Sequence, residues 1–202
     1  MRATRRSYHF LAMLLLFGVS ACLTSEPPTL KREDLVQPDG LAGVYFLALS
    51  NAANKQRASM EVEIKPGADG DYSVVPLTNG QPDKPMGLRL LSFKPDVYIG
   101  VLSNTAAETP IAMYAFVTLA PDQHWSVKLI DLAKDARTPA LLTVAKRHGV
   151  ANISFQKGMG GTNDDTMSGA LNAEQLRGLL GDPDFAAAIQ TEIEMELTAK
   201  PD

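Results

Sequence analysis

Apolar side chains at every second position are the feature that most limits how this chain can fold. The stretch 60–65, MEVEIK, alternates apolar with charged residues, and the stretch 125–129, WSVKL, alternates apolar with polar ones. Successive side chains of a strand point to opposite faces, so each stretch predicts a strand with one buried and one solvated face. Three further stretches, 44–49, 97–102 and 111–117, are apolar at nearly every position. They predict strands covered on both faces, by helices, by another sheet or by an enclosed ligand.

Turn signals separate these strands. ADGD at 68–71, TNG at 78–80 and PD at 121–122 supply Gly, Asn and Asp residues, which favour turns. Short strands with a turn roughly every ten residues favour an antiparallel meander, sandwich or barrel over a parallel sheet. We therefore expect an α+β fold with an antiparallel sheet of six or seven strands between 42 and 131. A barrel is one of the arrangements that such a sheet can adopt.

Helical signals follow this region. A helix is predicted over 138–149, where TP supplies the cap and first-turn residues and KRHG supplies C-terminal cations and a glycine. A strand over 150–155 comes next, and then a helix over 172–181 that opens on a capping box of Asn172 and Gln175. The fold therefore ends in two or three C-terminal helices.

The last segment fits two structures. A third helix is predicted from Asp182 and Pro183, because apolar residues recur every four positions from 185 to 197. The final part, EIEMEL at 192–197, also alternates like a strand. We favour the helix, since the four-residue period begins before the alternation, and the strand stays open.

The N-terminal sequence predicts an export signal. Three arginines precede an apolar run over 10–19, which is shorter than the roughly 20 residues that span a bilayer as a helix. A basic start, a short apolar middle and small residues at the end are typical of such signals; a short membrane anchor is the alternative. The stretch 4–8, TRRSY, resembles the start of a twin-arginine signal, so the general and twin-arginine export routes both stay open.

The motif VSAC at 19–22 closes the apolar run and resembles the lipobox of bacterial lipoproteins. The resemblance implies that Cys22 is the lipidation site: its thiol receives a diacylglyceryl group, and cleavage makes it the first residue of the mature chain. Leu23, where an Asp would retain a lipoprotein at the inner membrane, favours the outer membrane with the domain facing the periplasm. The chain then divides into a signal peptide (1–21), a flexible linker (22–40) and a single globular domain (41–202). The alternative for the linker is that Leu30 and Leu35 dock onto the domain.

Charge and composition exclude several partners. Loss of 1–21 removes three of the 19 basic residues and none of the 23 acidic ones, so the formal charge falls from −4 to −7. An acidic surface argues against nucleic acid, whose binding depends on Lys and Arg at the phosphates, and against a basic membrane-binding patch. Membrane attachment must then come from the lipid. Cys22 is the only cysteine, so the domain folds without a disulfide.

Candidate catalytic residues are few. His124 precedes a predicted strand and His148 ends a predicted helix, and neither an HExxH nor a G-x-S-x-G motif is present. Ser168 offers a hydroxyl near a glycine, as many chains of this size do. We therefore expect no catalytic residue, no metal site and no cofactor.

The stretch 157–165, KGMGGTNDD, is the most unusual internal segment. A glycine-rich anion loop and a calcium site are both conceivable here. The segment lacks the G-x-x-x-x-G-K-[ST] spacing of a phosphate loop, and it lacks the alternate ligands and closing Glu of a calcium loop. A mobile loop before the helix at Asn172 is the favoured interpretation.

Gly43-Val44-Tyr45 resembles the G-x-W opening of lipocalins, with Tyr in place of Trp. The order of seven or so strands, a helix and a strand is similar to that family, and the two further helices depart from it. This resemblance implies a barrel whose two-sided apolar strands line a cavity for an apolar ligand.

The expected function is that of a membrane-anchored, non-enzymatic envelope lipoprotein that recognises another envelope protein or a surface component. The alternative is a barrel-like carrier of a lipid or other apolar ligand. A hydrolase of unrecognised type is the third hypothesis, supported only by the export signal.

Overall fold

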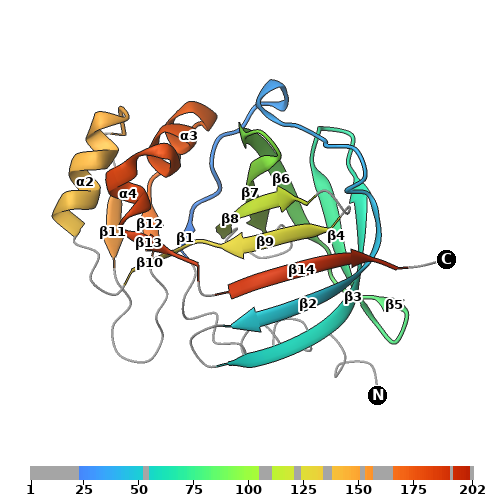
Figure 1. The fold of residues 1–202 in the computed structure, drawn as a ribbon. Coiled ribbons are helices and arrows are strands. Elements are labelled where there is room, and N and C mark those ends of the chain that lie inside the picture. The colour runs from blue at the N-terminus through green and yellow to red at the C-terminus, as the bar shows by residue number, and fades with distance from the viewer. Residues whose placement is uncertain are drawn as a thin grey trace, which may run out of the picture.

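The computed structural model describes residues 23–51, 55–104, 111–120, 124–133, 138–150, 153–156, 166–191 and 193–200. Its centre is a closed barrel of eight antiparallel strands (Figure 1). Seven strands follow one another around the barrel, and an eighth from the C-terminus completes it. They are β2 (Gly43–Asn51), β3 (Gln56–Pro66), β4 (Tyr72–Thr78), β6 (Met86–Lys94), β7 (Val97–Ser103), β8 (Ala112–Leu119), β9 (Trp125–Leu129) and β14 (Ile193–Ala199).

The C-terminal strand closes the barrel, so the predicted third helix does not extend to 197. β14 pairs with β2 along Ile193 to Ala199 and with β9 through Glu194 to Leu197. Ile193, Met195 and Leu197 point into the barrel and are buried, which explains why the alternation outweighs the four-residue period. The barrel therefore has eight strands instead of the six or seven predicted.

An apolar core, here the inner core, fills the barrel. The inward-facing side chains that are buried here are Tyr45, Leu47 and Leu49 of β2, Val62 and Ile64 of β3, and Ile193, Met195 and Leu197 of β14. Gly100 of β7 shows how tightly the centre is filled, because a methyl group there would lie 2.9 Å from Val117 Cγ2. Other members of the inner core are Leu90, Trp125 and Leu129.

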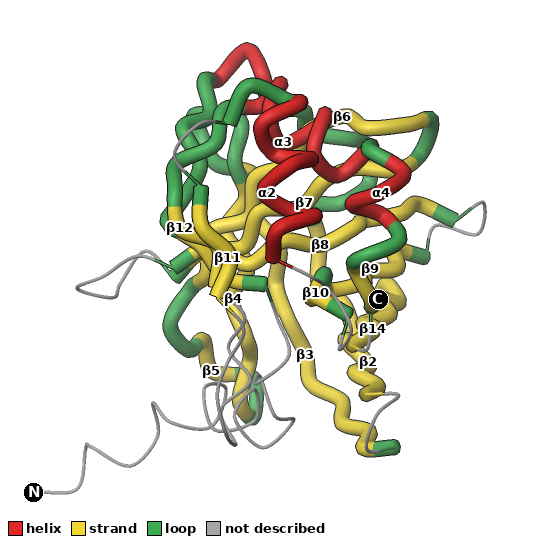
Figure 2. The backbone as a smooth tube through the Cα atoms, turned by 90° about the vertical axis from the view of Figure 1, so that its left-hand side faces the viewer, coloured by secondary structure: helices red, strands yellow, loops and turns green. Residues whose placement is uncertain are grey.

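The chain between β9 and β14 forms a second layer that covers one side of the barrel (Figures 1 and 2). Its elements are β10 (Asp131–Leu132), α2 (Thr138–Arg147), β11 (Ser154–Gln156), β12 (Thr166–Ser168), α3 (Ala173–Gly181), α4 (Pro183–Ala186) and β13 (Ile189–Gln190). Apolar side chains of this layer meet the outward-facing side chains of β6, β7 and β8 in an outer core. It includes Leu91, Ile99, Val101, Leu141, Leu176 and Phe185.

Both predicted helices form, and Thr138, predicted as a cap, is the first residue of α2. Gly149 just beyond the end of α2 has a φ of 72°. Asn172 and Gln175 form the predicted capping box of α3, with hydrogen bonds of 2.9 and 3.1 Å.

The expectation of cover on both faces is confirmed for two of the three apolar strands. β7 and β8 lie between the inner and the outer core. β2 differs, because Val44 and Phe46 on its outer face are 36 % and 43 % exposed. On this side of the barrel β2 pairs with β3 and β14, and no described element of the second layer pairs with it.

The N-terminal segment, residues 23–42, is folded onto the barrel, so the prediction of a flexible linker over 22–40 is wrong for its described part. β1 (Thr24–Ser25) pairs with β8 and β12. Further along, the Thr29 amide donates to Leu171 O and the Val36 amide to Leu90 O. The apolar side chains of Leu23 and Leu41, both 1 % exposed, explain this docking, because each enters one of the two cores.

The two ends of the barrel differ. At the end where β2 begins, the hydroxyl groups of Tyr45 and Tyr72 donate to Gly40 O and Pro38 O of the N-terminal segment, which covers it. At the opposite end the inward-facing side chains of Met60, Leu102 and Met113 are only partly buried. We call these the covered end and the methionine end.

Candidate functional site

Cys22, the predicted lipidation site, lies outside the described residues, and the structure begins at the next residue. Leu23 is buried, and its amide donates to Ile130 O at 2.8 Å. Among the described residues there is no helix of the length and hydrophobicity needed to cross a membrane.

A pocket of about 600 Å³ opens between the N-terminal segment and the outer face of the barrel. Its floor is β6 and β7, one wall is the turn between β3 and β4, and the other wall is the stretch 27–35, which contains the short 3₁₀ helix η1 (Arg32–Asp34). The lining residues are Pro27, Leu30, Arg32, Leu35, Asp69, Asp71, Gly87, Arg89 and Ser103.

Hydrogen bonds fix the walls of this pocket to one another. Arg177 of α3 donates to Ser92 O at 2.9 Å and to Asp34 O at 3.3 Å, which ties η1 to β6. The Gln37 amide group donates to Gly67 O and Asp71 O, which ties the N-terminal segment to the turn. The pocket is therefore held in shape before any ligand arrives.

The turn also depends on a glycine. Gly70 has a φ of +84°, a conformation that L side chains rarely adopt, and its Cα faces Leu35, whose Cβ is 3.4 Å from where a methyl group would be. The contact between Gly70 and Leu35 joins the turn to the segment that contains η1, and these two form the walls of the pocket.

The charges around the pocket are not paired with one another. Within the described part of the chain, no carboxylate forms an ion pair with the Arg89 guanidinium. Asp71 nevertheless lies across from Arg89, one step beyond the pair of Tyr72 and Leu88 in the β4–β6 register. The Asp71 carboxylate instead lies over Gly67, where an added methyl group would overlap Oδ1. Arg89 is half-buried on the pocket floor.

A buried polar pair lies beside the pocket. Tyr114 Oη and Ser25 Oγ are hydrogen-bonded, and both residues are buried on the outer side of β8. Burial raises the pKa of Tyr114 to about 12, against smaller lowering effects of Ser25 and Arg89. Tyr114 is therefore a neutral hydroxyl near pH 7, and its effect is to hold β1 on the barrel.

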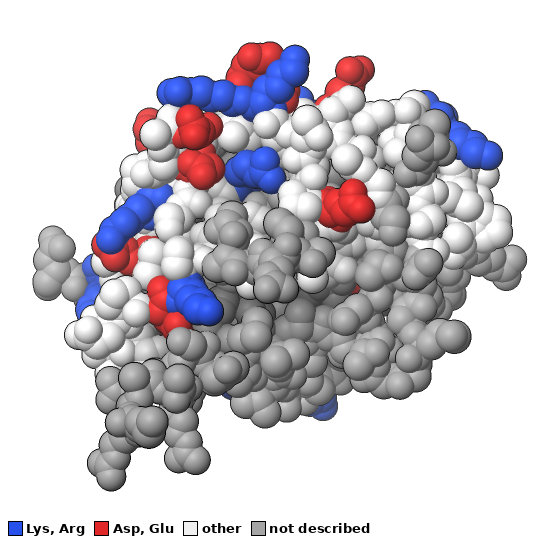
Figure 3. Space-filling view, turned by 180° about the vertical axis from the view of Figure 1, so that it is seen from behind, with Lys and Arg blue, Asp and Glu red and all other residues white. Residues whose placement is uncertain are grey.

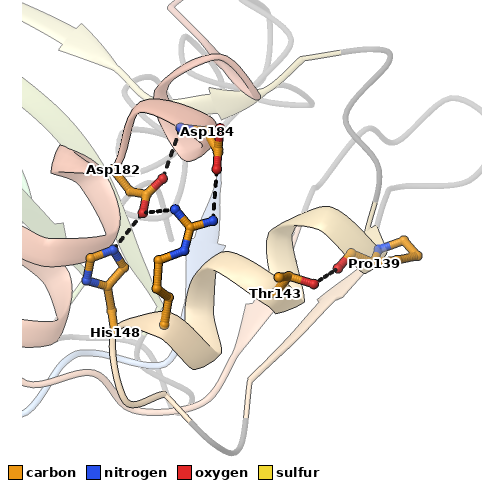
Figure 4. Close-up of polar contacts among 6 residues, drawn as sticks. Pro139, Thr143, His148, Asp182 and Asp184 are labelled. Atoms are coloured by element: carbon orange, nitrogen blue, oxygen red, sulfur yellow. Dashed lines mark hydrogen bonds and ion pairs between the residues drawn. The ribbon is translucent and has the colours of Figure 1, made fainter.

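A cluster of charges joins α2 to α4 (Figure 4). Asp182 Oδ2 accepts from His148 Nε2 at 2.9 Å and from Arg147 Nη1 at 3.0 Å, and Arg147 Nη2 lies 2.8 Å from Asp184 Oδ2. The Asp182 side chain is 4 % exposed and also caps α4 by accepting from the Asp184 amide. The hydrogen bond from His148, followed by the Asp184 amide and the Arg147 charge, lowers the pKa of Asp182 against the opposing effect of burial.

His148 lies just beyond the end of α2, and its imidazole contacts Asp182 at the start of α4. Its imidazole packs on α3, because a methyl group on Gly178 would come within 2.6 Å of Nδ1. One ring nitrogen faces Asp182 and the other faces a helix backbone, so the imidazole is a positioning group between three helices.

The remaining candidate residues are not brought into a site. His124 precedes β9 and its carbonyl accepts from the Ala120 amide, whereas Ser168 lies in β12, which pairs with β1 and β11. The stretch 157–165 lies outside the described residues. No group of three or more potential metal ligands occurs among the residues that are described.

The sequence did not predict the pocket. Its lining comes from residues 27–35, residues 69–71 and two strands, which lie together only because the N-terminal segment docks on the barrel.

Acidic and basic side chains are interspersed on the face seen in Figure 3.

The chain matches no family model, no curated protein and no solved structure.

Proposed function

We propose that this chain is a bacterial envelope lipoprotein, anchored by lipid on Cys22, whose folded part is a non-enzymatic interaction module. The lipobox at 19–22 carries the proposal. Two or three acyl chains, at about 0.8 kcal/mol for each buried methylene group, hold a protein at a membrane without any spanning helix.

The docked N-terminal segment supports a close attachment. Leu23 follows the lipidated cysteine directly and enters the outer core. No flexible linker then separates the lipid from the folded part, so the barrel lies at the surface of the bilayer. The barrel would be held there in a restricted set of orientations.

The pocket between η1, the turn and β6 supports recognition as the activity of the module. Arg89 and Asp71 present opposite charges there, and the walls are fixed by hydrogen bonds. Preorganised polar groups in a concave site favour binding, since little conformational freedom is lost.

The anchor is tested by fractionation of cells that express the full chain. Cys22→Ala is expected to keep its signal peptide and to lose lipid labelling, whereas Ser20→Ala, which keeps a small residue in the lipobox, is expected to be processed normally. A Cys22→Ala protein of mature size that remains in the membrane fraction would overturn the proposal.

A carrier of an apolar ligand is the second candidate, favoured by the methionine end. Met60, Leu102 and Met113 point inward and are only partly buried, and methionine side chains adapt readily to ligands. The filled centre at Gly100 limits such a ligand to this end. Native mass spectrometry of the full chain, released from detergent, tests this: a bound apolar mass that Met113→Arg removes would favour the carrier, and an apo mass would contradict it.

A further inference from the structure

The pocket described above suggests a ligand class. We infer that it binds a short zwitterionic peptide, with the peptide carboxylate at Arg89, the ammonium group at the Asp69 and Asp71 side, and an apolar side chain against Leu30 and Leu35. This inference rests on the proposed function as an interaction module, and it names the partner of its pocket.

Arg89 provides the first argument. Arg89 is half-buried on the outer face of β6, in the same cross-strand row as Val101 and Tyr114. No described carboxylate forms an ion pair with it. A guanidinium binds a carboxylate with two parallel hydrogen bonds, and partial burial strengthens them. An anionic group is thus the chemistry that this floor lacks.

Asp71 provides the second argument, because its carboxylate is held away from Arg89. The side chain lies over Gly67, and the Asp71 backbone carbonyl accepts from both the Gly67 amide and Gln37. Asp69 lies two residues earlier in the same turn and lines the same pocket. Both carboxylates line this side of the pocket, next to Arg32, and can accept hydrogen bonds from an ammonium group.

Size and apolar surface select a peptide over a simple ion. The volume of about 600 Å³ falls in the range of sites for molecules larger than a single amino acid. Pro27, Leu30 and Leu35 provide apolar surface on the wall that also carries Arg32. A molecule with two opposite charges and a short aliphatic side chain matches all three surfaces.

Calorimetric titration of the full chain in mild detergent tests the inference with three matched probes: leucyl-leucine, leucyl-leucine amide and N-acetyl-leucyl-leucine. The zwitterion is expected to bind about tenfold or more tightly than either blocked form, since each blocked form leaves a charged pocket group without its partner. Equal affinities, or no heat with any probe, would overturn the inference.

Two variants assign the ends of the ligand. Arg89→Gln should weaken leucyl-leucine about tenfold and remove its advantage over the amide, and Asp71→Asn should remove its advantage over the N-acetyl form. Arg57→Gln, an exposed cation on β3, should bind as the unmodified protein does. Circular dichroism confirms that each variant is folded. An Arg89→Gln protein that is folded and still prefers the zwitterion over the amide would contradict the assignment.

These titrations use purified protein and do not depend on the lipid anchor. A failure of the ligand inference is therefore distinguishable from a failure of the anchor, which fractionation of Cys22→Ala measures separately.

Discussion

The two outer faces of the barrel have opposite surroundings. The outer face of β7 and β8 lies under the second layer, whereas the outer face of β2 and β14 is open to solvent and carries charged pairs such as Lys128–Glu194 at 2.8 Å. Both faces belong to the same closed sheet. Whether a face is covered depends on the composition of the whole face and not on one strand. The outward-facing apolar residues of β2 are Val44, Phe46 and Ala48, and the outward-facing residues of the neighbouring strands β3 and β14 are largely charged.

The largest expected contrast is between two phenylalanines. Phe185 is fully buried in the outer core, with its ring centroid 6.2 Å from that of Phe155, and Phe46 is on the open face. Phe185→Ala should lower the free energy of unfolding by about 3–5 kcal/mol, and Phe46→Ala by less than about 1 kcal/mol. Urea denaturation measures both. Similar losses would mean that the second layer is not part of the stable core.

An added methyl group tests the filling of the inner face. Gly100→Ala should destabilise the protein by about 1–3 kcal/mol, because the new methyl group meets Val117 and the strands cannot separate freely. Thr198→Ala on the open face is the control and should change stability by less than about 0.5 kcal/mol. A neutral Gly100→Ala would show that the barrel holds free space at this level.

The charge cluster of the second layer should make stability depend on acid pH. Asp182→Asn should be destabilising at pH 7, and more so than Asp184→Asn, because Asp182 is the buried acceptor of three hydrogen bonds. The pKa of Asp182 is lowered in the folded state, so its contribution is present above the ordinary carboxyl pKa of about 4 and is lost as the pH falls through the lower folded value. In urea denaturation at several pH values, the difference in the free energy of unfolding between Asp182→Asn and the unmodified protein should become smaller below about pH 4. A difference that is independent of pH would contradict this.

Tyr114 should make stability depend on alkaline pH. Its pKa is raised to about 12 by burial, so folding favours the neutral hydroxyl; this stabilisation is complete below the ordinary pKa of about 10 and is lost as the pH rises towards 12. Tyr114→Phe should cost about 1 kcal/mol at pH 7 through the lost hydrogen bond to Ser25. Thermal unfolding between pH 9 and about 11 compares the two proteins, and Tyr72, whose pKa burial also raises to about 12, should keep part of the dependence in the variant.

The smallest effect is expected on the open face. Lys128 and Glu194 are 47 % and 41 % exposed, so Lys128→Ala should change stability by less than about 0.5 kcal/mol. The change should disappear in 1 M salt if it comes from the ion pair. A loss of several kcal/mol would show that the open face is stabilised by more than its strands.

The sequence predicts most strands and two helices because those signals are local. The alternation in 60–65 and 125–129 and the capping box of Asn172 depend only on neighbouring residues, and each prediction is confirmed. The alternation in 192–197 correctly indicated a strand. The strand forms because β14 fits between β2 and β9, which no local pattern in the sequence shows.

The N-terminal segment and the pocket depend on distant contacts. Prolines and mixed charges at 23–40 are typical of a linker, whereas the contacts that hold the segment on the barrel, from the pairing of β1 to the burial of Leu23 and Leu41, are made with distant residues. Arg89 looked like an ordinary polar residue of a strand. Its place beside Asp71 follows from the β4–β6 register, which no local pattern determines.

Mass spectrometry of the N-terminal peptide, from full-length protein expressed in a bacterium that processes lipoproteins, is the most direct test of the lipid anchor. We expect a chain that begins at Cys22 and carries a diacylglyceryl group on the thiol. A peptide that begins at Met1, or one that contains an unmodified Cys22, would contradict it.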